Sequence, residues 1–266
     1  MNEAELVLTD ILGCDRMSLY TRKKSRLSRG EALALCSIFK RRLRGEPLQY
    51  ILGKTEFMGL EFKVNPSVLI PRPETEILVE SVVKYVTTSQ RHNVTRILDM
   101  CTGSGCIAIS LAKNLKRCRI DAVDISAKAL QVARDNASRH NVDIGFIRSD
   151  LFDSSFLRKG SYDILVCNPP YVAQGEFSRL QPEVAHEPVQ ALYGGRDGLD
   201  FFRALASLSG AYLGRAGLLF AEMGYGQSGR VQKIFKGSGP FDIIEIIRDY
   251  AGIERIIVVK KKESYG

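Results

Sequence analysis

The tetrapeptide Asn168-Pro169-Pro170-Tyr171 follows the apolar run YDILVC and could hold a planar amino group. Neither proline donates a hydrogen bond, so the segment presents the side-chain oxygen of Asn168 and the carbonyl of Pro169 as acceptors. Pro170 keeps Pro169 out of the helical region, which leaves that carbonyl free, and Tyr171 adds a ring that can stack on a planar group. Two acceptors suit an NH2 nucleophile for methyl transfer, in which alignment matters more than a strong base. The alternative is a plain proline turn after a strand.

A glycine-rich loop after another apolar run, RIL, could bind a nucleotide. The loop consists of Cys101, Thr102, Gly103, Ser104 and Gly105. Glycines allow a sharp turn and let the backbone approach a ligand, and the helix expected next offers unpaired N–H groups. Asp124 ends the following apolar run, where a carboxylate binds a ribose diol in doubly wound nucleotide folds. The spacing also fits a dinucleotide-binding fingerprint, and a tight turn without a ligand is a further alternative.

Asp99 lies just before this loop and favours one of these ligands. Its negative charge would repel a pyrophosphate, whereas it can attract an ammonium group directly or through water. S-adenosylmethionine carries such an ammonium group, so we expect it as the cofactor. Asp150 and Leu151 follow a further apolar run and are expected near the adenine, with Asp150 accepting from the exocyclic amine and Leu151 offering an apolar face. The alternative for Asp150 is the N-cap of a following helix.

Strand and helix patterns along the chain predict the elements that position these residues. They alternate from residue 95 onward, which indicates a parallel sheet covered by helices on both faces. The last two strand patterns are joined too tightly for a crossover and are expected to be antiparallel neighbours. We therefore predict an α/β fold with a doubly wound, mostly parallel seven-stranded sheet. In such a sheet the strand before Asn168 lies beside the strand before the glycine loop, so both reach the switch-point crevice.

Three segments are expected along the chain. In the first, Gly13 ends one helix, and Ser28 and Glu31 form the capping box of a second helix that stops at Gly45. Both helices are too short to bury much surface alone, so they are expected to pack on another element. Pro73 begins a later helix. The predicted segments are a helical substrate-recognition domain, a β-hairpin linker and an S-adenosylmethionine-binding methyltransferase domain, at residues 1–46, 47–70 and 71–266.

The composition limits the partners and the compartment. The 266 residues carry a net charge of +8, and segments 21–26 and 39–44 hold much of it, which favours an acidic partner, proximity to nucleic acid or a solvated helix face. The six cysteines form no CxxC pair, so we expect them to be reduced residues of the core. No apolar run is long enough to span a membrane and the acidic start is unlike a signal peptide, so we expect a cytoplasmic protein. No metal site is expected, because the histidines are widely separated; they are His92, His140 and His186.

These motifs resemble the class I S-adenosylmethionine-dependent methyltransferases of the Asn-Pro-Pro-Tyr type. More closely, the chain is similar to the release factor glutamine N5-methyltransferases, the HemK/PrmC family, from QYILGKTEF through LIPRPETE, LDMCTGSGCIAI, CNPPYV and DYAGIERIIVV. The resemblance implies a Rossmann-like fold, S-adenosylmethionine turned into S-adenosylhomocysteine, and class I peptide chain release factors as the protein substrate. The methyl acceptor would be the side-chain amide nitrogen of the glutamine in their Gly-Gly-Gln tripeptide.

The same resemblance implies roles for individual residues. Residues 101–105, Asp124, Leu151 and Asn168 would contact the cofactor, and residues 168–171 would hold the glutamine. The chain departs from the family in two respects. A cysteine, residue 101, stands where many methyltransferases have the first glycine, which a small residue can replace if its φ is negative. The N-terminal helical region is also shorter than usual. We expect a monomer.

Other functions compete with this interpretation. A glutamine methyltransferase of a ribosomal protein shares several motifs, but segments 71–76 and 249–255 are more similar to the release factor enzyme. An adenine-N6 nucleic-acid methyltransferase would need a recognition module and an aromatic-lined groove for a flipped base, and neither is evident, so no direct nucleic-acid substrate is expected. A dinucleotide-dependent dehydrogenase has no use for the tetrapeptide. A non-catalytic binding module would leave the crevice idle.

Overall fold

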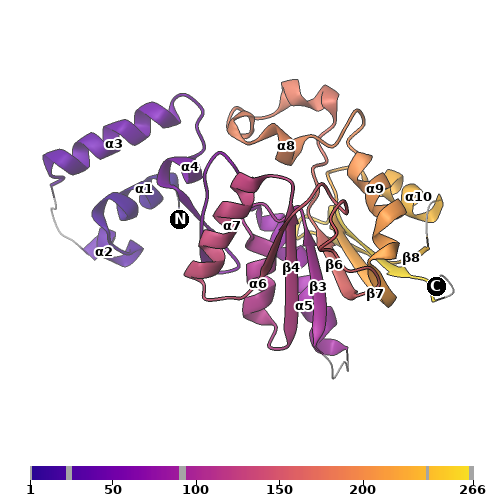
Figure 1. Cartoon of the computed structure of the whole chain (residues 1–266). Coiled ribbons are helices and arrows are strands. Elements are labelled where there is room, and N and C mark those ends of the chain that lie inside the picture. The colour runs from indigo at the N-terminus through magenta and orange to yellow at the C-terminus, as the bar shows by residue number, and fades with distance from the viewer. Residues whose placement is uncertain (1, 22–25, 90–93, 238–239, 264–266) are drawn as a thin grey trace.

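A seven-stranded sheet forms the centre of the protein (Figure 1). A computed structural model describes residues 2–21, 26–89, 94–237 and 240–263. The strands of the sheet are β3 (Thr95–Met100), β4 (Cys118–Asp124), β5 (Gly145–Arg148), β6 (Tyr162–Cys167), β7 (Leu213–Glu222), β8 (Phe241–Arg248) and β9 (Glu254–Lys261). Their order is β5-β4-β3-β6-β7-β9-β8, and β9 runs in the direction opposite to the other six strands. The predicted doubly wound sheet and its antiparallel closing pair are confirmed.

Helices cover both faces of the sheet, as expected for buried parallel strands. Neighbouring strand residues such as Ile97 and Leu98 point to opposite faces, and both are fully buried. One face packs against α5 (Pro73–Thr88) and α6 (Cys106–Asn114). The other packs against α9 (Asp200–Leu208) and α10 (Ser228–Gly237). α7 (Ala127–Arg139) follows β4 and also packs against the linker between residues 50 and 70.

The helix beginnings follow the signals in the sequence. Pro73 occupies the first turn of α5, where its missing N–H costs nothing. Ser126 accepts a hydrogen bond from the backbone N–H of Ala129 at the start of α7. Gly105, with φ of +81°, is the residue before α6. The prediction that Pro73 begins a helix is confirmed.

The linker differs in part from the prediction. A short helix, α4 (Leu48–Leu52), occupies residues that were expected to begin a hairpin, and the hairpin itself is β1 (Lys54–Phe57) with β2 (Leu60–Lys63). This helix ends at Gly53, which adopts the left-handed conformation. The helix buries the side chains of Leu48 and Tyr50. The predicted β-hairpin is therefore present, but it occupies only residues 54–63 of the linker.

The N-terminal helices stand beside the sheet (Figure 1). They are α1 (Glu3–Leu12), α2 (Arg16–Thr21) and α3 (Arg29–Arg42), and α2 was not predicted. Gly13 ends α1, and the capping box of Ser28 and Glu31 begins α3, as predicted. α3 ends before the expected stop at Gly45 and buries none of its residues. The domain boundaries at 46 and 70 remain predictions.

Other features bear on the expected roles of single residues. Each of the six cysteines is free, and no helix in the described part of the chain is both long and apolar enough to cross a membrane. Across the described residues, no group of His, Cys, Asp and Glu side chains is placed to hold a metal ion. The rings of His140 and His186 meet backbone carbonyls of Glu61 and Arg44. His92 and residues 22–25 of the basic segment lie outside the described residues.

Candidate active site

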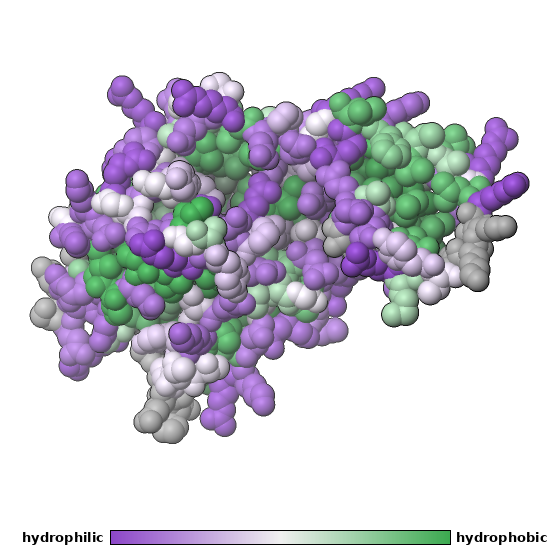
Figure 2. Space-filling view, turned by 180° about the vertical axis from the view of Figure 1, so that it is seen from behind, coloured by the Kyte–Doolittle hydropathy of each residue, from purple (hydrophilic) through white to green (hydrophobic). Residues whose placement is uncertain are grey.

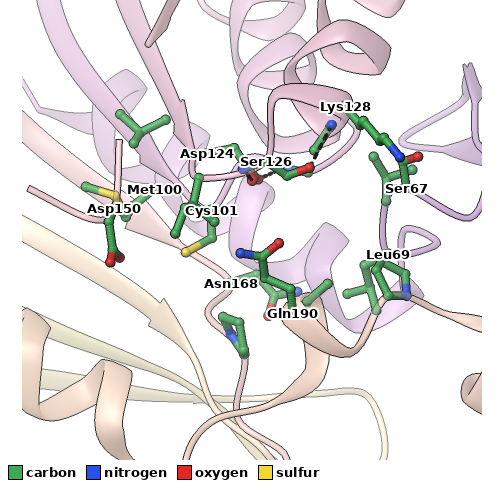
Figure 3. Close-up of a pocket in the computed structure, with 18 of the residues that line it drawn as sticks. Ser67, Leu69, Met100, Cys101, Asp124, Ser126, Lys128, Asp150, Asn168 and Gln190 are labelled. Carbon is green, nitrogen blue, oxygen red and sulfur yellow. Dashed lines mark hydrogen bonds between the residues drawn. The ribbon is translucent and has the colours of Figure 1, made fainter. Parts of the chain in front are cut away.

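A cavity of about 310 Å³ lies at the carboxyl ends of the central strands. Met100 pairs with Val123 on β4 and with Cys167 on β6, so the residues that follow these three meet at one level. Those residues are Cys101, Asp124 and Asn168, and all three line the cavity (Figure 3). Because β4 and β6 flank β3 on opposite sides, the cavity occupies the switch point of the sheet.

The glycine loop turns sharply immediately after β3. Cys101 has φ of +62°, so the condition of a negative φ, under which a small residue could replace the glycine without strain, is not met. The backbone N–H of Thr102 donates to Val123 O at 2.9 Å, which draws the loop over β4 and sets the left-handed turn. Gly103 also has a positive φ, of +56°, and lines the cavity. This geometry explains why glycine is common at the position of Cys101, since a Cβ costs free energy there.

Asp124 is held by the loop that it was expected to face. Its Oδ2 accepts from Gly103 N at 2.9 Å and its Oδ1 from Ser126 N at 2.9 Å. Burial raises the pKa of the carboxyl, against the effect of these two hydrogen bonds. A carboxylate has about four lone-pair sites, so two remain for hydroxyl groups of a ligand in the cavity. Figure 3 shows the hydrogen bond to Ser126 beside the open centre of the cavity.

Asp99 does not line the cavity. It is fully buried, and its Oδ2 accepts from the hydroxyl of Thr102 at 2.6 Å. Its Oδ1 has no hydrogen-bond partner within the described residues, and burial raises the pKa of the carboxyl to about 7. Because Asp99 does not reach the cavity, it cannot contact an ammonium group there directly as it stands, and contact through water stays a prediction. The unpaired oxygen is a buried acceptor that a cationic ligand nearby would stabilise.

The remaining loop residues support the turn. Thr102, Ser104 and Gly105 are absent from the cavity lining and lie beneath it, and Ser104 is buried. A Cβ at Gly105 would lie 3.1 Å from the Cβ of Ala133, so glycine there allows α6 to approach α7. These residues shape the loop. Their side chains do not line the cavity, so the expected contact with a cofactor stays a prediction and would involve their backbone groups.

Asp150 and Leu151 reach the cavity from the end of β5. Both line it, with Asp150 exposed and Leu151 at φ of +47°. The chain after Asp150 forms a turn closed by Asp153 N donating to Asp150 O at 3.0 Å, and no helix begins in the described stretch before β6. The N-cap alternative for Asp150 is therefore wrong. A left-handed backbone at a bulky residue is strained, and such strain gathers at ligand sites.

Asn168 carries its amide into the middle of the cavity (Figure 3). Its Nδ2 donates to the hydroxyl of Thr75 at 3.0 Å, whereas its Oδ1 meets no partner among the described residues. The side chain therefore offers an acceptor to the cavity, as the prediction for the tetrapeptide requires. Pro170 also lines the cavity, but Pro169 and Tyr171 do not.

The backbone of Tyr171 is enclosed by other segments. Its carbonyl accepts from Gln227 Nε2 at 2.8 Å. A Cβ at Gly194 would lie 2.7 Å from its Cα, and one at Gly198 would lie 2.5 Å from its carbonyl oxygen. Its hydroxyl donates to Glu222 at 3.4 Å, and burial raises the pKa of the phenol. The tetrapeptide is thus held in place by contacts with other segments, unlike a plain proline turn at the surface.

Two further segments, which the prediction missed, close the cavity. Residues 66–69 of the linker contribute to the lining, and so do Pro188, Gln190 and Ala191 around the start of the short helix α8 (Val189–Leu192). Glu187 holds them together, because its buried carboxylate accepts from Ile70 N at 3.1 Å and pairs with Arg72. Glu187 therefore acts as a structural link and does not line the cavity. No local motif marks these contacts, since they join segments more than one hundred positions apart.

Thr75 and Glu222 were also missed, although a signal for Glu222 was present. Thr75 accepts from Asn168 and donates to Glu222 Oε2 at 2.7 Å. Glu222 is the last residue of β7, which pairs with β6, so it is an acid at the carboxyl end of a central strand. The same signal singled out Asp124 on β4.

Comparison with known proteins places the chain in a family. Two family models match it, the PrmC N-terminal domain at residues 1–53 and the methyltransferase small domain at residues 74–194. A release factor glutamine methyltransferase of Thermodesulfovibrio yellowstonii is 41% identical over 267 residues, which cover 99% of this chain and 94% of that protein. This chain belongs to the release factor glutamine methyltransferase family. The family resemblance expected from the motifs is confirmed.

Other relatives agree with this assignment. A release factor glutamine methyltransferase of Geobacter sulfurreducens is 40% identical over 256 residues, covering 96% of this chain and 87% of that protein. A solved methyltransferase of Pyrococcus furiosus matches 88% of this chain and 100% of its own, with a TM-score of 0.55 and 14% identity. At that identity the structural match supports the methyltransferase fold alone.

Proposed function

We propose that the protein transfers a methyl group from S-adenosylmethionine to the side-chain amide nitrogen of the glutamine in the Gly-Gly-Gln tripeptide of class I peptide chain release factors. The observation that carries this is the Oδ1 of Asn168, which has no hydrogen-bond partner in the described part of the chain and lies at the switch-point cavity beside the glycine loop. Membership of the release factor glutamine methyltransferase family supports the substrate. Such an acceptor is a translation protein, so the reaction belongs to the cytoplasm.

The cavity has the polar groups that the cofactor requires. S-adenosylmethionine would supply a methyl group activated on a sulfonium. The carboxylate of Asp124 has lone pairs left for the ribose hydroxyls, and Asp99 has an unpaired buried oxygen beneath the loop. Leu151 and Ile125 offer apolar surface at the same cavity. Two carboxylates also stabilise the positive charge of the ligand.

The tetrapeptide would align the glutamine. A primary amide has two N–H hydrogens and no basic lone pair, so the nitrogen reacts only when it is held in line with the methyl group. Asn168 Oδ1 would accept one hydrogen and the carbonyl of Pro169 the other. Tyr171 would contact the amide plane through its ring. These roles of Asn168, Pro169, Pro170 and Tyr171 remain predictions.

The release factor would also bind outside the cavity. Residues 1–46 are proposed to recognise it, since α3 leaves Phe39 58% exposed and Leu43, which follows the helix, 86% exposed. Exposed apolar side chains on a small domain mark a protein-binding surface. A protein substrate presented by such a domain needs no nucleic-acid groove, and the protein is proposed to act as a monomer.

The test is a methyl-transfer assay with labelled S-adenosylmethionine. We expect label on a class I release factor and none on its variant with Gln→Ala in the Gly-Gly-Gln tripeptide. Labelling of protein-free DNA or RNA, or of a ribosomal protein in preference to the release factor, would contradict the proposal. Asn168→Ala should lower kcat by about two orders of magnitude while the affinity for the cofactor changes little, because it removes the aligning acceptor. A parallel loss of cofactor binding would indicate a folding role instead.

A further inference from the structure

One buried carboxylate is connected to both ends of the tetrapeptide. Glu222 is 2% exposed and lies at the end of β7. Its Oε2 accepts from the hydroxyl of Thr75 at 2.7 Å, and its Oε1 accepts from the hydroxyl of Tyr171 at 3.4 Å. Thr75 in turn accepts from Asn168 Nδ2 at 3.0 Å. The chain of hydrogen bonds therefore runs from Glu222 through Thr75 to Asn168.

The directions of these hydrogen bonds are fixed by proton counting. An ionised carboxylate can only accept, so Thr75 must give its single hydroxyl proton to Glu222. The oxygen of Thr75 is then left as an acceptor, and of the two ends of the Asn168 amide only Nδ2 can donate to it. Asn168 Oδ1 must therefore face the cavity. Without this chain the amide could turn over and present a donor to an NH2 group, which also donates.

We propose that Glu222 and Thr75 are positioning residues that hold the amide of Asn168 with its oxygen toward the methyl acceptor. This inference rests on the proposed function, because only an NH2 acceptor requires an oxygen there. Glu222 does not line the cavity and does not touch the substrate. Its second oxygen meets the hydroxyl of Tyr171, so the same carboxylate also supports the ring.

The protonation of Glu222 should switch the arrangement. Burial raises the pKa of its carboxyl to about 7, with Glu74 adding to the effect and Thr75, Tyr171 and Arg255 opposing it. Two buried thiols, Cys106 and Cys167, also face this charge, and their pKa values are raised well above those of free thiols, so they stay neutral. A protonated Glu222 can donate to Thr75, which then directs its own proton at Asn168 and favours the reversed amide. The turnover number should therefore fall as the pH decreases through about 7.

The kinetic test removes the middle of the chain of hydrogen bonds. Thr75→Val should lower kcat by about tenfold or more, while the KM for S-adenosylmethionine stays within about twofold, because the lost hydrogen bond orients Asn168 and touches no ligand. Thr75→Ser keeps the hydroxyl and should restore most of the rate. Ser81→Ala is the matched control, since Ser81 lies on the same helix and its hydroxyl bonds to Ile77 O at 2.6 Å. It should behave as the wild type.

The dependence of kcat on pH distinguishes a positioning role of Thr75 and Glu222 from a packing role. In Thr75→Val and in Glu222→Gln the decline of kcat below about pH 7 should be much smaller than in the wild type, because Asn168 no longer senses an ionisable group and only Asp99 at the site still has a pKa near 7. A decline that persists unchanged in both variants would overturn the proposal. So would a Thr75→Ser variant as impaired as Thr75→Val, since that result indicates a packing role for the methyl group.

A measurement that needs no substrate tests the hydrogen-bond chain independently of the proposed methyl transfer. The side-chain NH2 resonances of Asn168, assigned in ¹⁵N-labelled protein by their loss in Asn168→Ala, should titrate with a midpoint near pH 7 and cease to do so in Thr75→Val. If no release factor is methylated but this titration is present, the function is wrong and the hydrogen-bond chain stands. If methylation occurs and the resonances show no titration that depends on Thr75, the chain is wrong and the function stands.

Discussion

At the scale of single residues, Asp124 has a structural role and is also proposed to bind the cofactor. Both carboxylate oxygens accept backbone N–H groups, from Gly103 and from Ser126, and these hydrogen bonds fix the loop and the start of α7 around the cavity. A group that is already committed to two donors is rigid, so its remaining lone pairs are preorganised for a ligand. The carboxylate therefore needs no rearrangement to bind hydroxyl groups.

Asp124→Asn should weaken cofactor binding by about tenfold or more, because an amide has one acceptor oxygen and its NH2 must face a backbone N–H or the ligand. Isothermal titration calorimetry with S-adenosylmethionine measures the change. Asp135→Asn is the control, since Asp135 lies on α7 and pairs with Lys63 at the surface. An affinity equal to that of the wild type in Asp124→Asn would remove Asp124 from the binding site.

The buried carboxyls predict how stability depends on pH. Burial raises the pKa of Glu222 from 4.5 to about 7 and that of Asp99 from 3.8 to about 7. The folded state thus binds protons more tightly than the unfolded state, so this contribution to stability is complete at low pH and is lost as the pH rises through about 7. Each group contributes a slope of up to about 1.4 kcal/mol per pH unit between its two pKa values.

Glu222→Gln should therefore reduce the loss of unfolding free energy between pH 5 and pH 8, because one of the buried carboxyls with a raised pKa is removed. Urea unfolding at several pH values measures the difference. The exposed Glu245 on β8 provides the control substitution Glu245→Gln, which should leave the wild-type slope. A slope in Glu222→Gln equal to that of the wild type would show that Glu222 is ionised without cost in the folded protein.

The sequence predicted the residues of the site better than it predicted their contacts. Asp124 and Asn168 could be placed because each follows a recognisable strand and parallel strands end together. Asp99 was placed correctly on its strand, but alternation along the strand turns its side chain to the buried side of the loop. The conformation of Cys101 could not be read from its type, since only the hydrogen bond of the next residue to β4 fixes it.

At the scale of elements, the tetrapeptide depends on glycines far along the chain. Gly194 and Gly198 in the loop before α9 and Gly224 after β7 all approach Tyr171 within the distance of a Cβ contact. Val172 also donates to Leu192 O at 2.8 Å, which ties the tetrapeptide to that loop. The orientation of the acceptors is therefore set by packing between segments, and the local proline geometry alone does not determine it.

Gly194→Ala should damage catalysis by displacing the tetrapeptide. Its Cβ would lie 2.7 Å from the Cα of Tyr171 and 2.8 Å from Pro170 O, and backbone cannot give way as a flexible side chain can. We expect a stability loss of about 1–3 kcal/mol from overpacking, together with a fall in kcat. Unfolding curves and release factor methylation measure the two effects.

Gly175→Ala is the matched control for this change, because no atom lies within 4 Å of a Cβ at Gly175. It should retain the stability and the rate of the wild type. Full activity in Gly194→Ala would mean that the tetrapeptide shifts without consequence, which contradicts the alignment argument. If Gly194→Ala is partly unfolded, the rate measured with saturating cofactor, divided by the folded fraction from the unfolding curves, still reports the effect on catalysis.

Elements with strong periodic patterns were the ones that could be predicted. The alternation from β3 to β9 gave the sheet and its antiparallel end. α4 was missed because five residues carry too little periodicity to separate a helix from a strand. α10 was missed because glycines and polar residues surround its few buried side chains, among them Val231 and Phe235.

At the scale of the whole molecule, the N-terminal helices and the cavity are joined through one loop. Arg42 on α3 pairs with Glu183 at 3.0 Å, and the ring of His186 meets Arg44 O at 3.3 Å. The same loop continues into the start of α8, which contributes to the cavity lining. A protein bound to the N-terminal helices would therefore lie close to the segment that closes the site.

The surface of the N-terminal helices is suited to such a protein. Green, apolar residues gather over these helices at the right of Figure 2. The exposed apolar side chains of this region are Met17, Tyr20, Leu27, Leu33, Phe39 and Leu43. Basic side chains in the last turn of α3 lie beside them, so the region combines apolar and positively charged groups. A release factor surface with apolar and acidic side chains would complement it.

The double substitution Phe39→Ser with Leu43→Ser should raise the KM for an intact release factor by about tenfold, because an apolar contact outside the cavity is lost. It should leave kcat, and the rate with a short peptide containing Gly-Gly-Gln, unchanged, since α3 buries no residue and the sheet does not depend on these side chains. Ile244→Ser provides the control, because Ile244 is 53% exposed on β8 at the opposite end of the sheet. If the double substitution impaired methylation of the peptide and of the intact release factor equally, the N-terminal helices would influence the cavity itself. If neither were affected, the release factor would bind elsewhere, and the exposed face of α3 would have no part in substrate recognition.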